Sequence, residues 1–124
     1  MIKPKKKPRF DIPFDRIKDD VFPSKKYELS LVFVDKKFSH RLNKSFRGKD
    51  YPTNVLSFPL SKNSGEIFID LDTAKKEAKE FEMTFREFVI FLFIHGLLHL
   101  KGMQHGATME KRERTLFNSW RDKS

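Results

Sequence analysis

The chain has 124 residues and no cysteine, which excludes disulfides and thiolate metal sites and leaves enough length for one domain with its own core. Lysine and arginine outnumber aspartate and glutamate by 26 to 17, so the formal net charge is +9. An excess of this size on a small domain favours a polyanionic partner, and nucleic acid is the leading class.

Residues 1–9, MIKPKKKPR, combine prolines with a run of basic residues and are predicted to form a mobile basic arm before a single domain over residues 10–124. No apolar segment or small-residue cleavage site follows the arm, so it does not resemble a secretory signal. The longest apolar stretch, residues 88–100, is shorter than the roughly 20 residues that span a bilayer. We therefore expect a cytoplasmic protein without a membrane partner.

The first predicted strand covers residues 27–34, where apolar and aromatic residues dominate. Asp35 is placed to cap the helix that follows. In that helix Phe38, Leu42 and Phe46 recur every four residues and are predicted to line one helix face. The segment RGKDYP then ends the helical pattern.

Two further strands are predicted over residues 54–60 and 66–70. The turn residues SKNSG between them indicate a hairpin with a five-residue loop. Asp70 or Asp72 can cap the next helix, TAKKEAKEF, whose many charged residues are typical of a surface helix.

A different kind of helix is predicted next. Thr84 and Glu87 have the spacing of a capping box, and the run FVIFLFIHGLLHL is apolar on nearly every side, as in a helix surrounded by other elements. Gly102 stands where a left-handed residue would end it. A last helix starts near Thr108 and ends about Trp120, closing the core.

Three of the four histidines lie within HGLLHLKGMQH, residues 95–105. His95 and His99 are four residues apart, so on a helix they share one face, about 6 Å apart along the axis. A tight reversal after Gly102 would bring His105 back to the same point. Three imidazoles without an anionic ligand are typical of a catalytic zinc site, in which the fourth position is left for water.

The alternative is that the histidines are hydrogen-bonded core residues. Burying three imidazoles beside phenylalanine and leucine costs free energy, however, and one ion would satisfy all three, which favours metal binding. The pattern is not the metalloprotease motif H-E-x-x-H, because Gly96 stands in place of the catalytic glutamate. A peptidase would therefore lack its general base.

These residues carry a family resemblance. HGLLHLKGMQH resembles the H-G-x-L-H-L-x-G-x-x-H metal motif of the YbeY family of bacterial endoribonucleases that mature rRNA. Upstream, LNKSFR and TNVLSF resemble the family's L-N-x-x-[FY]-R and T-D-V-L-S-F, and GEIFI resembles its G-[DE]-I strand, in the same order. The resemblance runs from about residue 27 to residue 105.

The resemblance implies an α/β (α+β) fold with a small four-stranded mixed sheet packed with several helices around one central helix. It also implies one zinc ion held by His95, His99 and His105. Arg47, with His99, is the expected catalytic residue, because a guanidinium facing the metal across an RNA groove can hold a phosphate. Ser57 could bind substrate from the strand, although a sheet-face hydroxyl is the alternative.

Two residues depart from the family pattern. Asn54 and Gln104 stand where many members carry aspartate. An amide can orient a ring or a water molecule but cannot take a proton. The mechanism is therefore expected to depend on metal-activated water or on the RNA's own 2′-OH.

The function implied by the resemblance is a single-strand-specific, metal-dependent endoribonuclease in 16S rRNA maturation and ribosome quality control. Single-stranded RNA, rRNA, and the ribosome or ribosomal proteins are the expected partners, and DNA is not. The alternative is a non-catalytic rRNA-binding assembly factor with a structural metal. A zinc hydrolase of small molecules is weaker, because the charge of +9 would then have no role.

Overall fold

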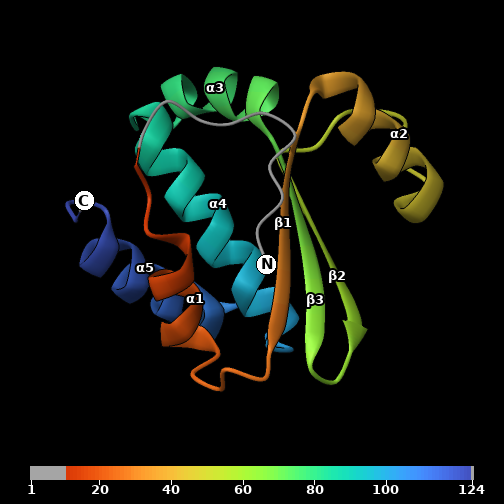
Figure 1. Ribbon diagram of the computed structural model, residues 1–124. Helices are drawn as coiled ribbons and strands as arrows, with labels where there is room; N and C mark the ends of the chain where they lie inside the picture. The colour runs from red at the N-terminus through yellow and green to blue at the C-terminus, as the bar shows by residue number, and fades with distance from the viewer. Residues whose placement is uncertain (1–10, 124) are drawn as a thin grey trace.

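Five helices and three strands make up residues 11–123, the part of the chain described by the structure, a computed structural model (Figure 1). The arm predicted over residues 1–9 lies outside the described residues. In chain order the elements are α1 (Phe14–Val21), β1 (Glu28–Val34), α2 (Lys36–Arg47), β2 (Val55–Ser61), β3 (Ser64–Asp70), α3 (Leu71–Glu80), α4 (Phe85–Leu100) and α5 (Ala107–Trp120).

The sheet has the strand order β1-β3-β2, with β1 parallel and β2 antiparallel to β3. The expected four-stranded sheet is therefore wrong for residues 11–123, although the mixed α+β class is correct. All three strands predicted from the residues form, and the fourth was implied by the resemblance alone. The described segment before β1 is instead the unpredicted helix α1, because Phe14, Ile17 and Val21 share one buried helical face.

The hairpin between β2 and β3 is tighter than predicted. Only Lys62 and Asn63 separate the two strands, because the pairing continues to Ser61 and Ser64 after an irregularity at Pro59. The hydroxyls of Ser61 and Ser64 lie 2.7 Å apart in a hydrogen bond across the end of the hairpin. The turn residues at both ends of the predicted five-residue loop thus belong to the strands.

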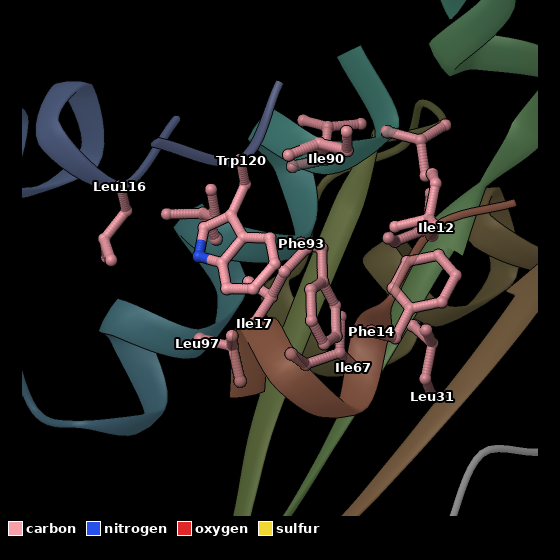
Figure 2. Packing of buried hydrophobic residues seen from close by; sticks show 14 of the residues in the cluster. Ile12, Phe14, Ile17, Leu31, Ile67, Ile90, Phe93, Leu97, Leu116 and Trp120 are labelled. Atoms are coloured by element: carbon pink, nitrogen blue, oxygen red, sulfur yellow. The ribbon is translucent and has the colours of Figure 1, made fainter. Parts of the chain in front are cut away.

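Helix α4 is the central helix, as its apolar sequence predicts. Nine of its sixteen residues are buried, and α1, α3, α5 and the sheet all contact it (Figure 1). The rings of Phe93 and Phe14 meet edge to face at 4.9 Å between centroids, and Figure 2 shows both beside Ile17 in the core. Burying each such side chain contributes about 1.5–3 kcal/mol to stability.

Within residues 11–123, no single helix is long and apolar enough to cross a bilayer. Helices α3 and α4 reach that length and apolar composition only together, and the chain bends by 110° at the break between them.

Both ends of α4 follow the sequence signals. Thr84 accepts a hydrogen bond from the backbone N–H of Glu87 at 3.1 Å, and the Glu87 carboxylate accepts one from the backbone N–H of Thr84 at 2.9 Å, which completes the capping box. At the other end Gly102 has φ +96°, and the N–H of Met103 donates to the carbonyl of Leu98 at 3.0 Å. The chain therefore reverses just before His105.

Helix α2 lies on the face of the sheet opposite α4. Phe68 alternates along β3 with Ile67 and Ile69, which are fully buried, so it points to the other face. There its ring lies 6.1 Å from that of Phe38 in α2. Helix α2 thus leaves the histidine-bearing face of the sheet to α4.

The predicted apolar stripe of α2 is only partly buried. Phe38 and Leu42 are half-buried, whereas Phe46 is 67% exposed. The buried residues of this helix are instead Ser39 and Asn43. The Ser39 hydroxyl donates to the carboxylate of Asp70 in β3 at 2.6 Å, and the Asn43 amide donates to the backbone carbonyl of Tyr51 at 2.8 Å. The Ser39 hydroxyl and the Asn43 amide N–H group thus find partners, whereas Oδ1 of Asn43 is buried without one among the described residues.

The two predicted acidic caps are present. Asp35 accepts from the N–H of Phe38 at 2.9 Å and caps α2, and Asp70 accepts from the N–H of Thr73 at 2.9 Å and caps α3. The buried Asp70 carboxylate also accepts from the hydroxyl of Ser39. One carboxylate thereby fixes α2, β3 and α3 relative to one another.

Candidate active site

Three histidines converge at the end of α4. His95 and His99 come from its last two turns and are half-buried, and His105 follows the reversal and is exposed. One ring nitrogen of each lies within 4.8 Å of the others, and the Nε2 atoms of His95 and His99 are 3.0 Å apart. The convergence expected from the helical spacing and the glycine stop is present, and the group can hold a metal ion.

The donor set suits a transition metal. Each ring offers one nitrogen as a ligand atom, the ligand type found in three-histidine zinc sites. Burial lowers the pKa of His99, and the neighbouring His95 and His105 lower it further. A lowered pKa keeps the imidazole neutral at physiological pH, as metal binding requires. The residues therefore fit a bound ion, and zinc is the assignment that the sequence favours.

Glu113 of α5 is a site residue that the sequence analysis did not find. It is only 7% exposed, and its carboxylate is hydrogen-bonded to Nδ1 of His95, which leaves Nε2 directed to the other histidines. A signal did exist. Met109, Leu116 and Trp120 mark the buried face of α5, and Glu113 falls on that face at helical spacing.

A cavity of about 500 Å³ opens over the histidines. Because β2 is an edge strand, its free edge and the segment before it supply one wall. The volume lies in the range of small-molecule sites and can take one nucleotide-sized group. The lining residues are Arg47, Thr53, Asn54, Val55, Leu56, Ser57, Phe58, His95, His99 and His105.

Arg47 shares this cavity with the three histidines. It is the last residue of α2 and is exposed, and Gly48 ends the helix with φ +68°. Its positive charge contributes to lowering the pKa of His99, after burial and the neighbouring histidines. A guanidinium so placed can bind a phosphate with two parallel hydrogen bonds.

Ser57 lines the same cavity from β2, and its hydroxyl donates to the backbone carbonyl of Gly96 at 3.2 Å. A Cβ atom on Gly96 would lie 2.9 Å from the Ser57 oxygen and 3.1 Å from Ile67 Cδ1. The hydroxyl thus bridges α4 and β2 where the two pack closely. Substrate binding by Ser57 stays a prediction.

The two residues that replace family carboxylates differ in position. Asn54 lines the cavity, and its side-chain amide donates to Glu77 of α3 at 2.7 Å. Gln104 is exposed and is not a lining residue. His40, the fourth histidine, lies on α2 and is hydrogen-bonded to Asp50 at 2.7 Å, with 41% of its side chain exposed.

Comparison with known proteins agrees with this arrangement. The family model described as Endoribonuclease YbeY matches residues 10–121. The Endoribonuclease YbeY of Neorickettsia sennetsu is 41% identical over 100 residues, which cover 72% of this chain and 70% of that protein. That of Alkaliphilus oremlandii is 38% identical over 108 residues, covering 75% and 72% respectively.

A solved structure is also similar. The solution structure of a Thermotoga maritima protein superimposes with a TM-score of 0.67 and 25% sequence identity, and the match covers 94% of this chain and 87% of that one. The family model spans nearly the whole chain and includes all three histidines, Arg47 and Glu113. The chain belongs to the endoribonuclease YbeY family.

Proposed function

We propose that this endoribonuclease cuts single-stranded ribosomal RNA with a zinc ion held by His95, His99 and His105. The observation that supports the proposal is that the histidines and Arg47 line one cavity on a domain with a net charge of +9. Anionic RNA and a cationic site are complementary, and the affinity should fall steeply as salt is added.

The three histidines would hold the ion, whose chemistry is polarisation of the scissile phosphate and activation of the attacking oxygen. Arg47 binds the non-bridging oxygens of that phosphate and stabilises the negative charge that develops on them in the transition state. Glu113 keeps the ring of His95 oriented through Nδ1. Protein groups thus supply phosphate binding and orientation.

The preference for single strands follows from the size of the site. A cavity of about 500 Å³ beside an edge strand has the volume for one nucleotide unit, which a single strand can place there without first leaving a paired partner. The cellular role belongs to the same proposal: maturation of small-subunit rRNA and ribosome quality control in the cytoplasm, with the ribosome or ribosomal proteins as partners and DNA excluded. It rests on the family resemblance.

The experiment is single-turnover cleavage of a labelled single-stranded RNA at saturating protein, with metal content measured on the same untagged samples. We expect His99→Ala to lose both zinc and cleavage. Arg47→Ala should keep zinc, whereas its cleavage rate falls about 100-fold or more, as when one transition-state donor is removed. Arg41→Ala, an exposed arginine of the same helix that is not a lining residue, is the matched control.

Two outcomes would contradict the proposal. Unchanged cleavage in folded His99→Ala and Arg47→Ala would assign the activity to a contaminant. If the parent binds RNA and zinc but cleaves nothing, the alternative of a non-catalytic assembly factor with a structural metal would replace the endoribonuclease.

A further inference from the structure

Phe46 is a large aromatic residue that the fold leaves uncovered beside the cavity. Phe38 and Leu42, the other members of its stripe on α2, are half-buried, but the last turn of the helix carries Phe46 out to 67% exposure. Covering a phenylalanine is worth up to about 3 kcal/mol, so leaving it in water forgoes stability. Stability of the isolated fold therefore does not explain this side chain.

The ring of Phe46 is supported from one side. It meets the ring of Phe58 at 5.2 Å with an interplanar angle of 60°, and Phe58 in turn meets Phe68 of β3 at 5.9 Å. Phe58 is itself a lining residue of the cavity. Phe46 is not itself a lining residue, but it adjoins the cavity through Phe58 and through Arg47, its neighbour in sequence, and its exposed ring is open to a ligand.

The surroundings of Phe46 are cationic. Arg47 is its neighbour in sequence and lines the cavity, and Lys49 lies within three residues and is exposed. Lys44, two residues before Phe46, is also exposed but forms an ion pair with Asp50 at 3.9 Å. A flat apolar surface among positive charges is complementary to a ligand that alternates flat rings with phosphates. Single-stranded nucleic acid has that structure, and proteins bind it through stacking on aromatic side chains in basic grooves.

We propose that Phe46 is a base-stacking residue, on which a nucleobase next to the phosphate held by Arg47 stacks. The inference rests on the proposed function, because it needs RNA in the cavity. Phe46 then selects for single strands, since a base in a duplex is already stacked on its neighbours and has no free face to offer. The residue also fixes which phosphate of the strand lies over the histidines.

The test is equilibrium binding of a labelled single-stranded 2′-O-methyl oligoribonucleotide to the zinc-loaded full chain, with the oligonucleotide checked for integrity afterwards. Phe46→Ala and Phe46→Leu should each weaken binding about tenfold, whereas Phe46→Tyr should bind as the parent does. The leucine variant separates stacking from simple apolar contact. Phe46 is exposed enough that all three variants should fold, and circular dichroism checks this.

The matched control is Phe81→Ala. Phe81 is 61% exposed, but it follows α3 and stacks on Phe88 near the start of α4, at the end of that helix away from the histidines. Its removal should leave RNA binding unchanged. If Phe46→Ala and Phe81→Ala lost RNA affinity equally, the loss would come from removing any exposed aromatic side chain. That result would overturn the stacking role of Phe46.

Abasic substitutions locate the stacked base. Each position of the oligonucleotide is made abasic in turn, and binding is measured with the parent and with Phe46→Ala. At one position the two losses should fail to add, because both remove the same stacking contact. Additive losses at every position would overturn the proposal. Full binding by the leucine variant would also overturn it and would indicate a simple apolar contact with the RNA instead of stacking.

Failure of this inference and failure of the proposed function give different results. If the parent binds no single-stranded RNA, the proposed function fails and the stacking role fails with it. If the parent binds and cleaves RNA while Phe46→Ala binds as tightly, only the stacking role is overturned.

Discussion

Glu113→Gln tests whether the buried carboxylate supports metal binding by its charge as well as by its shape. The glutamine oxygen can still accept the hydrogen bond from Nδ1 of His95, but the negative charge is lost. Removing such a partner from a ligand histidine costs about 10- to 100-fold in metal affinity, or about 1.4–2.7 kcal/mol. Because its hydrogen bond survives, the glutamine variant should lie near the lower value and Glu113→Ala near the upper.

The assay is competition for zinc against a chelator of known affinity, with the untagged parent and variants. Glu110→Gln is the matched control, because Glu110 lies on the same helix and is exposed. Its affinity should equal that of the parent. If folded Glu113→Ala bound zinc as tightly as the parent, the carboxylate would have no role at the site and the orientation of His95 would need another cause.

Three further substitutions test the positions that hold the site. Gly96→Ala should lower the free energy of unfolding in urea by about 1–3 kcal/mol, because the added Cβ would lie 2.9 Å from Ser57 Oγ and 3.1 Å from Ile67 Cδ1. An unchanged urea midpoint of unfolding would show that α4 and the sheet move apart easily. Thr84→Ala should cost about 1 kcal/mol through loss of the cap, and no loss would mean that the capping box is not formed. Gly102→Ala should lower the free energy of unfolding by about 1–2 kcal/mol, because residue 102 has a φ of +96°. It should also weaken zinc binding, because the chain reversal before His105 would be displaced. A zinc affinity equal to the parent's would show that this turn does not position the site.

The sequence predicted those features whose causes are local. Asp35, the pair Thr84 and Glu87, and Gly102 act on backbone groups within a few residues, so their spacing was sufficient to place helix ends. The histidine cluster was predictable for the same reason. The four-residue spacing of His95 and His99 on a helix, followed by a chain reversal before His105, determines most of the geometry of the cluster.

The features that the sequence did not predict depend on contacts between distant elements. Glu113 meets His95 across 18 residues, and nothing in either segment alone specifies that pairing. The outward position of Phe46 depends on where the sheet stops covering α2, which periodicity cannot show. The three strands were predicted from their own residues, and only the fourth, implied by the resemblance, is missing from residues 11–123.

Asn54 shows what the replacement of a carboxylate does to the site. Its amide donates to the carboxylate of Glu77 at 2.7 Å, a hydrogen bond that an ionised aspartate, which can only accept, could not make. No aspartate or glutamate is then among the described residues that line the cavity. The wall offers a phosphate only cationic and neutral groups, so in the proposed mechanism these residues bind and orient the phosphate and no lining carboxylate removes a proton.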